Sequence, residues 1–416
     1  MNLRRPTRLI VALALLVASG CAVGPDYSRP QIELPPQWRE LDVHEAQAFA
    51  NAPWWELFQD PTLQDLLRTA LAQNKDLATA VARIEQQRAV YAFQRADLIP
   101  KIEAYGAADR SRASKEGRVP IPQSVDPEGA TFQVGGSLSW EVDLFGRIRR
   151  ATEAEQATLL ATEEARRAVV IELVSAVATA YMDLRDFDAR FDIARRTLEA
   201  RRDYVELVKA RFEGGVTSEL DWRQAEAEFH RVETIVYDFE RLVALTEHSL
   251  DVLLGRNPVS VPRGRTLVEQ PVPPAIPAGL PSDLLERRPD VRQAEHTLVA
   301  ANARIGEAKA LLFPQISLTG FFGWESTDLG NLFVGPAKAW SISGALLQPV
   351  FNAGKNLARV EATEWQQRQA LYAYELSILQ AFREVEDALV GFRTTGAQRR
   401  AQASRVAAER KVPRTG

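Results

Sequence analysis

Two stretches of this chain are related: DLATAVARIEQQRAVYAFQRADLIPKIEAYG, from Asp76 to Gly106, and DVRQAEHTLVAANARIGEAKALLFPQISLTG, from Asp290 to Gly320. They lie 214 residues apart and align without a gap. Identical residues include the pairs Asp76/Asp290, Ala80/Ala294, Ala96/Ala310, Leu98/Leu312, Pro100/Pro314, Ile102/Ile316 and Gly106/Gly320. In both copies the apolar pattern changes from helical to alternating at the same proline. A whole helix-to-strand unit is therefore repeated, which predicts a quasi-symmetric assembly and not a short-period solenoid.

The N-terminus has the pattern of a secretory signal peptide over residues 1–20. Three arginines precede an apolar run from Leu9 to Val17, which is too short to span a bilayer as a helix. The box Ala-Ser-Gly-Cys that follows resembles a bacterial lipobox, which implies that Cys21 becomes a lipidated N-terminus carrying diacylglycerol and an N-acyl chain. Ala22, which is not Asp, favours the outer membrane by the same resemblance. The alternative is a lone cysteine, the only one in the chain, that happens to follow a signal peptide.

Composition excludes some classes of partner and of membrane protein. The 416 residues are 46% hydrophobic and 25% charged, with a net charge of −4, which argues against nucleic acid as a partner. After Cys21 no apolar run approaches the length of a transmembrane helix. If the chain crosses a membrane, it must therefore do so as a closed β-barrel.

Alternating apolar and polar residues predict four strands. In the clearest of them, Phe132, Val134, Leu138 and Trp140 share one face. The alternative is a soluble sandwich, but the strands occur as two separated pairs. Four strands are also too few to close a membrane barrel, so several chains must pool theirs. The predicted strands are residues 101–110, 131–143, 315–325 and 339–350.

Charge-rich segments without Gly or Pro predict a long antiparallel helical hairpin over residues 147–254. Gly214 and Gly215 break it, and Thr217 or Ser218 can begin the returning helix. The alternative for such helices is a soluble coiled-coil spacer. With the repeat, these elements divide the chain into 1–20, 21–60, a first repeat at 61–255, a linker at 256–282 and a second repeat at 283–416.

The chain resembles the TolC-type outer membrane factors of tripartite efflux systems, in the NodT-like lipoprotein branch. The resemblance extends from Cys21 to about Gly391. It rests on Trp54-Trp55, Phe58, Asp60-Pro61, Leu63, Asn74, Asp76-Leu77, the run Trp140 to Gly146, Gly214-Gly215, Ser218, Asp221, Gln224-Ala225, Leu284-Leu285, Arg287 to Asp290, Ala294-Glu295, Ile305-Gly306, Phe313-Pro314 and Leu318.

The resemblance implies an α+β membrane protein. Three copies would pool twelve strands in one outer membrane β-barrel, continued in the periplasm by an α-barrel of long helical hairpins. The partners implied are a periplasmic adaptor, an inner membrane pump and outer membrane lipid. Residues 21–60 and 256–282 would form an equatorial belt, and Pro100 and Pro314 would mark the helix-to-strand junctions. The periplasmic tip that contacts the adaptor would comprise Gly214, Gly215, Thr217, Ser218 and Asp221, although Asp221 also has an ordinary reading as a first-turn residue favoured by the helix dipole.

The second repeat departs from the family because it lacks the returning helix. Gly391 and Gly396 are expected to interrupt its last helix, and residues 411–416 have the pattern of a tail. We expect a truncated or frame-disrupted member with an incomplete helical barrel, which leaves a non-functional efflux factor as an alternative.

No catalytic residue, metal site or further cofactor is predicted. The four histidines lack metal-binding spacing, and the chain has no phosphate-binding loop or nucleophile elbow. Two other classes remain as alternatives: a structural periplasmic coiled-coil lipoprotein, and an enzyme carried on a lipid anchor. The exported substrate and the matching pump stay open.

Overall fold

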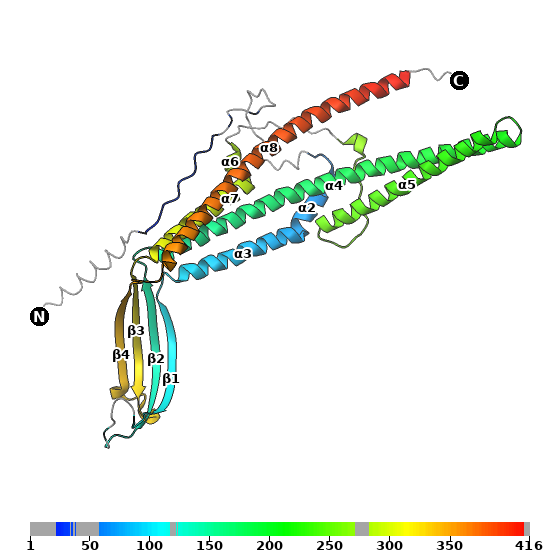
Figure 1. Cartoon of the computed structure of the whole chain (residues 1–416). Helices are drawn as coiled ribbons and strands as arrows, with labels where there is room; N and C mark the ends of the chain where they lie inside the picture. Colours follow the sequence, from blue (N-terminus) through cyan, green and yellow to red (C-terminus); the bar gives the residue numbers. More distant parts are fainter. Residues whose placement is uncertain are drawn as a thin grey trace. The chain divides into compact units, whose positions relative to one another are not determined.

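The computed structural model describes residues 22–33, 35, 38, 58–116, 122, 124–270 and 283–411 (Figure 1). The expected signal peptide, Cys21, Trp54-Trp55 and residues 271–282 of the linker lie outside the described residues. The main elements are α2 (Pro61–Gln73), α3 (Lys75–Ala96), β1 (Lys101–Arg112), β2 (Glu128–Val142), α4 (Arg147–Glu213), α5 (Glu219–Leu253), α6 (Asp283–Arg287), α7 (Pro289–Ala310), β3 (Gln315–Ser326), β4 (Lys338–Leu347) and α8 (Lys355–Lys411).

The repeat is visible in the bounds of these elements. Helices α3 and α7 each have 22 residues, strands β1 and β3 each have 12, and the bounds of each pair differ by 214. In both copies four residues connect helix and strand, and the last of the four is proline. Proline has no backbone N–H and disfavours the helical conformation in the preceding residue, so it suits this position.

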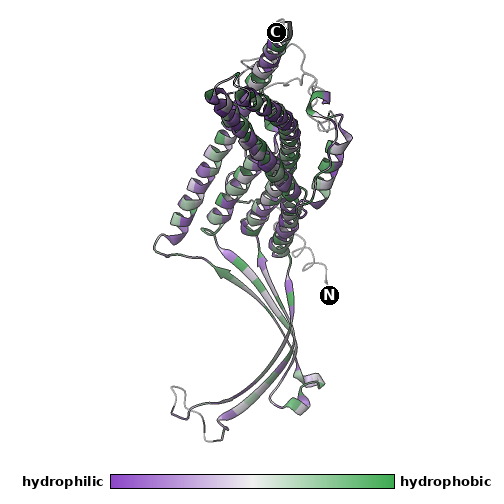
Figure 2. Cartoon of the chain, turned by 90° about the vertical axis from the view of Figure 1, so that its right-hand side faces the viewer, coloured by the Kyte–Doolittle hydropathy of each residue, from purple (hydrophilic) through white to green (hydrophobic). Residues whose placement is uncertain are grey.

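The four strands form one antiparallel sheet in the order β1-β2-β3-β4 (Figure 1). The register pairs Tyr105 with Gly135, Gly135 with Gly323 and Gly323 with Ala339. Figure 2 shows hydrophobic and hydrophilic residues following one another along the strands. The two faces of the sheet therefore differ in polarity.

The strands differ from their predicted bounds by one to three residues, and β2 and β4 each differ by three residues at one end. β2 begins at Glu128, three residues early, because Glu128 pairs with Arg110 and Arg112 of β1 at 3.3 and 3.2 Å. β4 ends at Leu347, three residues before the predicted end, because Pro349 cannot donate a hydrogen bond to a neighbouring strand.

The chain divides into two compact units. The first contains the sheet and the helix segments within Ile84–Ala161 and Gln293–Ser377, with the N-terminal Met1–Ile32. Small side chains let its helices approach closely. Glu155 of α4 joins two of the other helices, since it accepts a hydrogen bond from Gln87 at 2.7 Å and pairs with Arg304 at 3.5 Å. The buried alanines of α4 and α7 are Ala151, Ala154, Ala157, Ala300, Ala303 and Ala308.

The second unit comprises Glu33–Arg83, Thr162–Arg292 and Ile378–Gly416. Its core joins α2, α4 and α5 with Val261 of the segment that follows α5. The largest fully buried side chains of this core are Leu63, Leu67, Val174, Val177, Tyr181, Leu184, Leu250 and Leu254. Burial of each contributes about 1.5–3 kcal/mol.

The expected interruption of the last helix at Gly391 and Gly396 is wrong. α8 continues through both glycines to Lys411, and residues 412–416 lie outside the described part. A glycine costs a helix interior about 1 kcal/mol, which the backbone hydrogen bonds of this helix of 57 residues outweigh. The hydroxyl groups of Thr394 and Thr395 donate to the carbonyl oxygens of Val390 and Gly391 at 2.8 and 2.6 Å.

Candidate functional site

One face of the sheet, the apolar face, exposes large hydrophobic side chains at the even-numbered positions of the strands. Phe322 is 65% exposed, Trp340 73% and Ile342 79%. They line a shallow groove of about 580 Å³ together with Ile102 and Leu138. An exposed apolar patch of this kind marks a surface that is normally covered by lipid or by another protein.

The opposite face, the polar face, carries mostly small and hydroxyl-bearing side chains at the odd-numbered positions. Of its four acidic side chains within the described strands, Glu103, Asp109 and Glu325 have no Lys or Arg within ion-pair distance, whereas Glu141 pairs with Arg147. Water suits such a surface and hydrocarbon does not. Its small polar members are Thr131, Ser137, Ser139, Ser317, Thr319, Ser341 and Ser343.

The outer edges of β1 and β4 have no neighbouring strand among the described residues. Unpaired edges present free N–H and C=O groups that readily pair with another chain. Both long strands are regular, so another sheet could extend this one on either side.

The junction between β2 and α4 explains the run from Trp140 to Gly146. The indole N–H of Trp140 donates to the carbonyl oxygen of Leu98 at 3.2 Å, and Glu141 forms a two-point ion pair with Arg147 at 2.7 and 2.9 Å. The carboxylate of Asp143 accepts hydrogen bonds from two backbone N–H groups in the first turn of α4, at 3.0 and 2.8 Å. The two oxygen atoms thus fix the start of the long helix at the end of the sheet.

Residues 22–33, which we term the N-terminal strap, lie against α4 and α7. Val23 donates its N–H to Phe145 at 3.1 Å, and the buried Arg150 pairs with Asp26 at 2.7 Å. Gly24 has a φ of +104° and fits only because residue 306 is also glycine: a Cβ on Gly24 would lie 2.4 Å from the Cα of Gly306.

An ion pair holds the other end of the strap to α7. Arg29 bonds Glu295 through both nitrogens at 2.6 and 2.5 Å, and the hydroxyl of Tyr27 donates to the same carboxylate at 3.1 Å. Burial opposes the charge of Glu295, but the bonds from Arg29 outweigh it and lower the pKa of that carboxyl. Burial, and next the neighbouring Glu295, raise the pKa of Tyr27 above its ordinary value.

In the second unit, Asp60 joins the start of α2 to the segment after α5. Its buried carboxylate accepts hydrogen bonds from the Tyr181 hydroxyl at 2.8 Å, Gln270 at 2.7 Å and two backbone N–H groups, those of Thr62 and Arg265. Burial raises the pKa of Asp60 and these bonds outweigh it, so the pKa lies below its usual value. Burial, and next the bond to Asp60, raise the pKa of Tyr181 to about 12.

The turn between α4 and α5 contains all five residues that the sequence assigned to the tip. Gly215 has a φ of +73°, and the N–H of Val216 donates back to Arg211 at 2.8 Å, which closes α4. Ser218 caps α5 and forms a capping box with Asp221. The Ser218 hydroxyl, and next its N–H, lower the pKa of Asp221. Thr217 is half-buried, and its buried hydroxyl oxygen makes no hydrogen bond among the described residues.

An aromatic stack beside this turn was missed by the sequence analysis. The rings of Phe212 and Trp222 lie 5.6 Å apart at an angle of 20°, and the guanidinium of Arg223 lies 4.0 Å from the centre of the Trp222 ring. The spacing of ten residues across the two glycines could have indicated that these rings face each other across the turn.

The family model of outer membrane efflux proteins matches residues 66–256 and 280–414 of this chain. The toluene efflux pump outer membrane protein TtgC of Pseudomonas putida is 37% identical over 404 residues, which cover 95% of this chain and 82% of TtgC. The chain belongs to the outer membrane efflux protein family.

Other members of this family share the fold and differ in the solutes that their names mention. The cation efflux system protein CusC of Escherichia coli is 34% identical over 388 residues, or 92% of this chain and 82% of CusC. The open state of the MtrE outer membrane channel of Neisseria gonorrhoeae superposes with a TM-score of 0.83, at 30% identity over 94% of this chain and 86% of MtrE.

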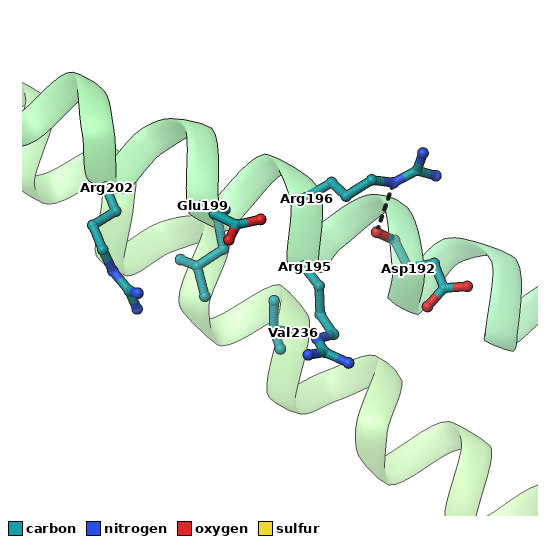
Figure 3. Close-up of a pocket in the computed structure, with 7 residues that line it drawn as sticks. Asp192, Arg195, Arg196, Glu199, Arg202 and Val236 are labelled. Carbon is teal, nitrogen blue, oxygen red and sulfur yellow. Dashed lines mark hydrogen bonds between the residues drawn. The ribbon is translucent and has the colours of Figure 1, made fainter.

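The α4–α5 hairpin of this efflux protein has an open, charged groove of about 600 Å³ (Figure 3). Arg195, Arg196 and Arg202 line it with Asp192 and Glu199, and the Nε of Arg196 donates to the Asp192 carbonyl oxygen at 3.2 Å. The opposite charges compensate one another along a solvent-facing helix. This arrangement is typical of a solvated surface.

The described residues contain neither a metal-binding cluster nor a membrane-crossing helix. No group of three or more His, Cys, Asp or Glu side chains there could hold a metal ion. None of the helices described combines the length and the low charge that a membrane-crossing helix requires.

Proposed function

We propose that this chain is the outer membrane channel of a tripartite efflux system and conducts solutes passively from the periplasm to the outside. The observation that carries the proposal is the two-faced sheet with both edges free. One face of this sheet is suited to lipid and the other to water.

Three copies would close their sheets into one barrel. Each contributes four strands, so pairing of β4 in one copy with β1 in the next gives a ring of twelve, enough for a membrane barrel. The apolar face would contact outer membrane lipid, and the polar face would line the aqueous lumen. A head-to-tail interface of this kind is finite only if the ring closes.

The helices would continue the channel in the periplasm and meet the other two components. We propose that the turn formed by Gly214, Gly215, Thr217, Ser218 and Asp221 contacts the periplasmic adaptor, through which the inner membrane pump delivers solutes. The exposure of Val216 at 67% and of Leu220 at 65% supports this, because apolar side chains at a turn are favourable contacts for a partner.

A covalent lipid on Cys21 would add a membrane anchor. The support is the Ala-Ser-Gly-Cys box itself, and Ala22, the next residue, lies beside the first turn of α4, where a Cβ on Gly146 would be 2.6 Å from its Cβ. Cys21→Ser should abolish incorporation of labelled palmitate. Labelling of the variant at the wild-type level would contradict the lipid site.

The same variant separates a channel from a periplasmic spacer. A protein held by membrane strands stays in the membrane pellet after carbonate extraction even without its lipid, whereas a spacer held only by lipid is released. We expect Cys21→Ser to stay in the pellet and the further change Ile342→Asp, on the apolar face, to release it. Ser341→Asp, on the polar face of the same strand, is the matched control and should stay.

Transport itself is tested by export. In a strain that lacks its own outer membrane factor but has an adaptor and pump, a working channel should restore resistance to the pump's substrates, whereas the truncated, non-functional factor considered from the sequence should not. An assembled trimer that passes no ion current in planar bilayers would contradict the proposed function.

A further inference from the structure

The polar face of the sheet contains two aromatic rings among small side chains. Tyr105 of β1 and Phe321 of β3 are the aromatic residues at odd-numbered positions of the four described strands. Their ring centres lie 6.4 Å apart, edge to face at 90°. Phe321 has Ser137 and Ser341 as its cross-strand partners.

Two glycines make room for the ring of Phe321. Gly135 and Gly323 pair directly with each other in neighbouring strands. A Cβ on Gly135 would lie 2.9 Å from Cε2 of Phe321, and a Cβ on Gly323 would lie 2.8 Å from its Cζ. Two edge atoms of the ring, Cε2 and Cζ, therefore occupy the space that side chains at these glycines would need, and the residue stays partly exposed. Tyr105, opposite Gly135, is 44% exposed beside it.

Negative charge flanks this aromatic pair on both sides. Glu103 stands two residues before Tyr105 on the same face of β1, and Glu325 stands four residues after Phe321 on β3. Glu325 accepts a hydrogen bond from Gln133 at 3.3 Å, and neither carboxylate has a cation within ion-pair distance among the described residues. The nearby Lys101 is paired with Asp97 at 2.9 Å.

We propose that the Tyr105–Phe321 pair is a contact site for organic cations with an aromatic or apolar body on their way through the channel. The inference rests on the proposed function, which turns the polar face toward the lumen. The carboxylates attract a cation to this part of the sheet, and the exposed parts of the two rings bind its charge and its apolar body. Three copies would place three such pairs around one lumen.

A purely structural role for Phe321, as a cover for the glycines, makes a different prediction. Such a cover stabilises the sheet but does not distinguish between solutes. A contact site distinguishes cations that carry a ring from those that do not. The test therefore compares benzyltrimethylammonium with tetramethylammonium, which has the same charge and lacks the phenyl group.

The experiment measures block of the ion current through the purified trimer in planar bilayers, with each variant referred to its own current in KCl. We expect benzyltrimethylammonium to block the wild type at concentrations at least about threefold lower than tetramethylammonium does. Phe321→Leu should remove this difference, and Phe321→Tyr should retain it. Phe322→Leu, on the apolar face of the same strand, is the matched control and should retain it too.

A second variant pair keeps the test decisive if Phe321→Leu forms no trimer. Glu103→Gln with Glu325→Gln leaves the rings in place and should weaken block by both cations. Equal block of the wild type by both cations, or unchanged selectivity in Phe321→Leu, overturns the inference while a normal KCl current leaves the proposed function standing. The absence of any current from the wild-type trimer overturns the proposed function and the inference with it.

Discussion

In the second copy of the repeat the N-terminal strap covers α7, whereas the corresponding positions of α3 in the first copy are bare. Gly306 of α7 is buried under Gly24, but its counterpart Ala92 is exposed. Glu295 binds two strap residues, but its counterpart Val81 is 42% exposed. Although α3 and α7 have equal lengths, α7 is therefore covered by a segment of its own chain, whereas the matching surface of α3 is open to contact with a neighbouring chain.

The helices that leave the sheet differ in the same way. α4 packs against the core of the second unit and against α5, whereas α8 exposes large side chains along much of its length. Trp365 is 53% exposed, Tyr372 62% and Leu379 67%, at spacings of seven residues that place them on one side of the helix. We expect α8 and α3 to complete each other between copies.

The largest predicted effect is on α8. Trp365→Asp would replace a large apolar side chain in the contact between copies with a charged one and should weaken that contact by about 3 kcal/mol or more. The fraction of trimer in detergent, measured by size-exclusion chromatography with light scattering, should fall sharply. Gln366→Asp, at the next and more polar position, should assemble normally, and an intact trimer of the Trp365 variant would show that α8 faces solvent.

A serine introduced at matching positions of the two copies measures how much the strap contact contributes to stability. Gly306→Ser should destabilise the protein by about 2 kcal/mol, because a Cβ there would lie 2.7 Å from the carbonyl oxygen of Val23 and 2.8 Å from Cγ of Arg150. Ala92→Ser at the matching position should change stability by less than about 0.5 kcal/mol. Thermal unfolding measures both, and equal losses would mean that the strap does not distinguish the copies.

The strap ion pair should depend on pH. Glu295 has a lowered pKa in the folded chain, so its contribution is complete above the ordinary carboxyl pKa and is lost as pH falls through the lowered value. Glu295→Gln should cost about 1 kcal/mol at neutral pH, a modest figure because Arg29 is 41% exposed to screening solvent. The loss should disappear in acid. Glu85→Gln on α3, whose partner Arg88 is exposed, is the control and should be nearly neutral at either pH.

The smallest predicted effect is at the tip, which only the first copy has among the described residues. Ser218→Ala removes the cap of α5 and should speed amide hydrogen exchange around the turn by about fivefold without changing global stability. Thr217→Val should leave exchange unchanged, because the Thr217 hydroxyl has no partner to lose. Faster amide exchange around the turn in the Thr217 variant alone would contradict this description of the cap.

The sequence predicted the features that are local or repeated. The change of pattern at Pro100 and Pro314 located both helix-to-strand junctions, and the alternation around Trp140 separated the two faces of the sheet. Contacts between distant residues were beyond it. Nothing in residues 22–33 indicates that Gly24 contacts Gly306. Nor does the sequence around Asp60 indicate that its carboxylate binds Tyr181 and Gln270.

Local rules also failed where a long element overrides them. Gly391 and Gly396 favour a break, but α8 continues because the backbone hydrogen bonds of a helix of 57 residues outweigh the cost of two glycines. The alternating pattern also could not explain Gly135 and Gly323, because each leaves space for the ring of Phe321, and that contact is not visible in the sequence.

The most direct test of the account is a covalent link between the free edges of the sheet. A photo-reactive amino acid at Ala107 of β1 should link to β4 of another copy, because β1 and β4 lie at opposite edges of the sheet in one chain. Mass spectrometry would identify the linked strand, and denaturing gels would give the number of copies. Linked species that end at three, joined from β1 to β4, are the predicted result. A ladder that continues beyond three, or links that never reach β4, would contradict a closed channel of three chains.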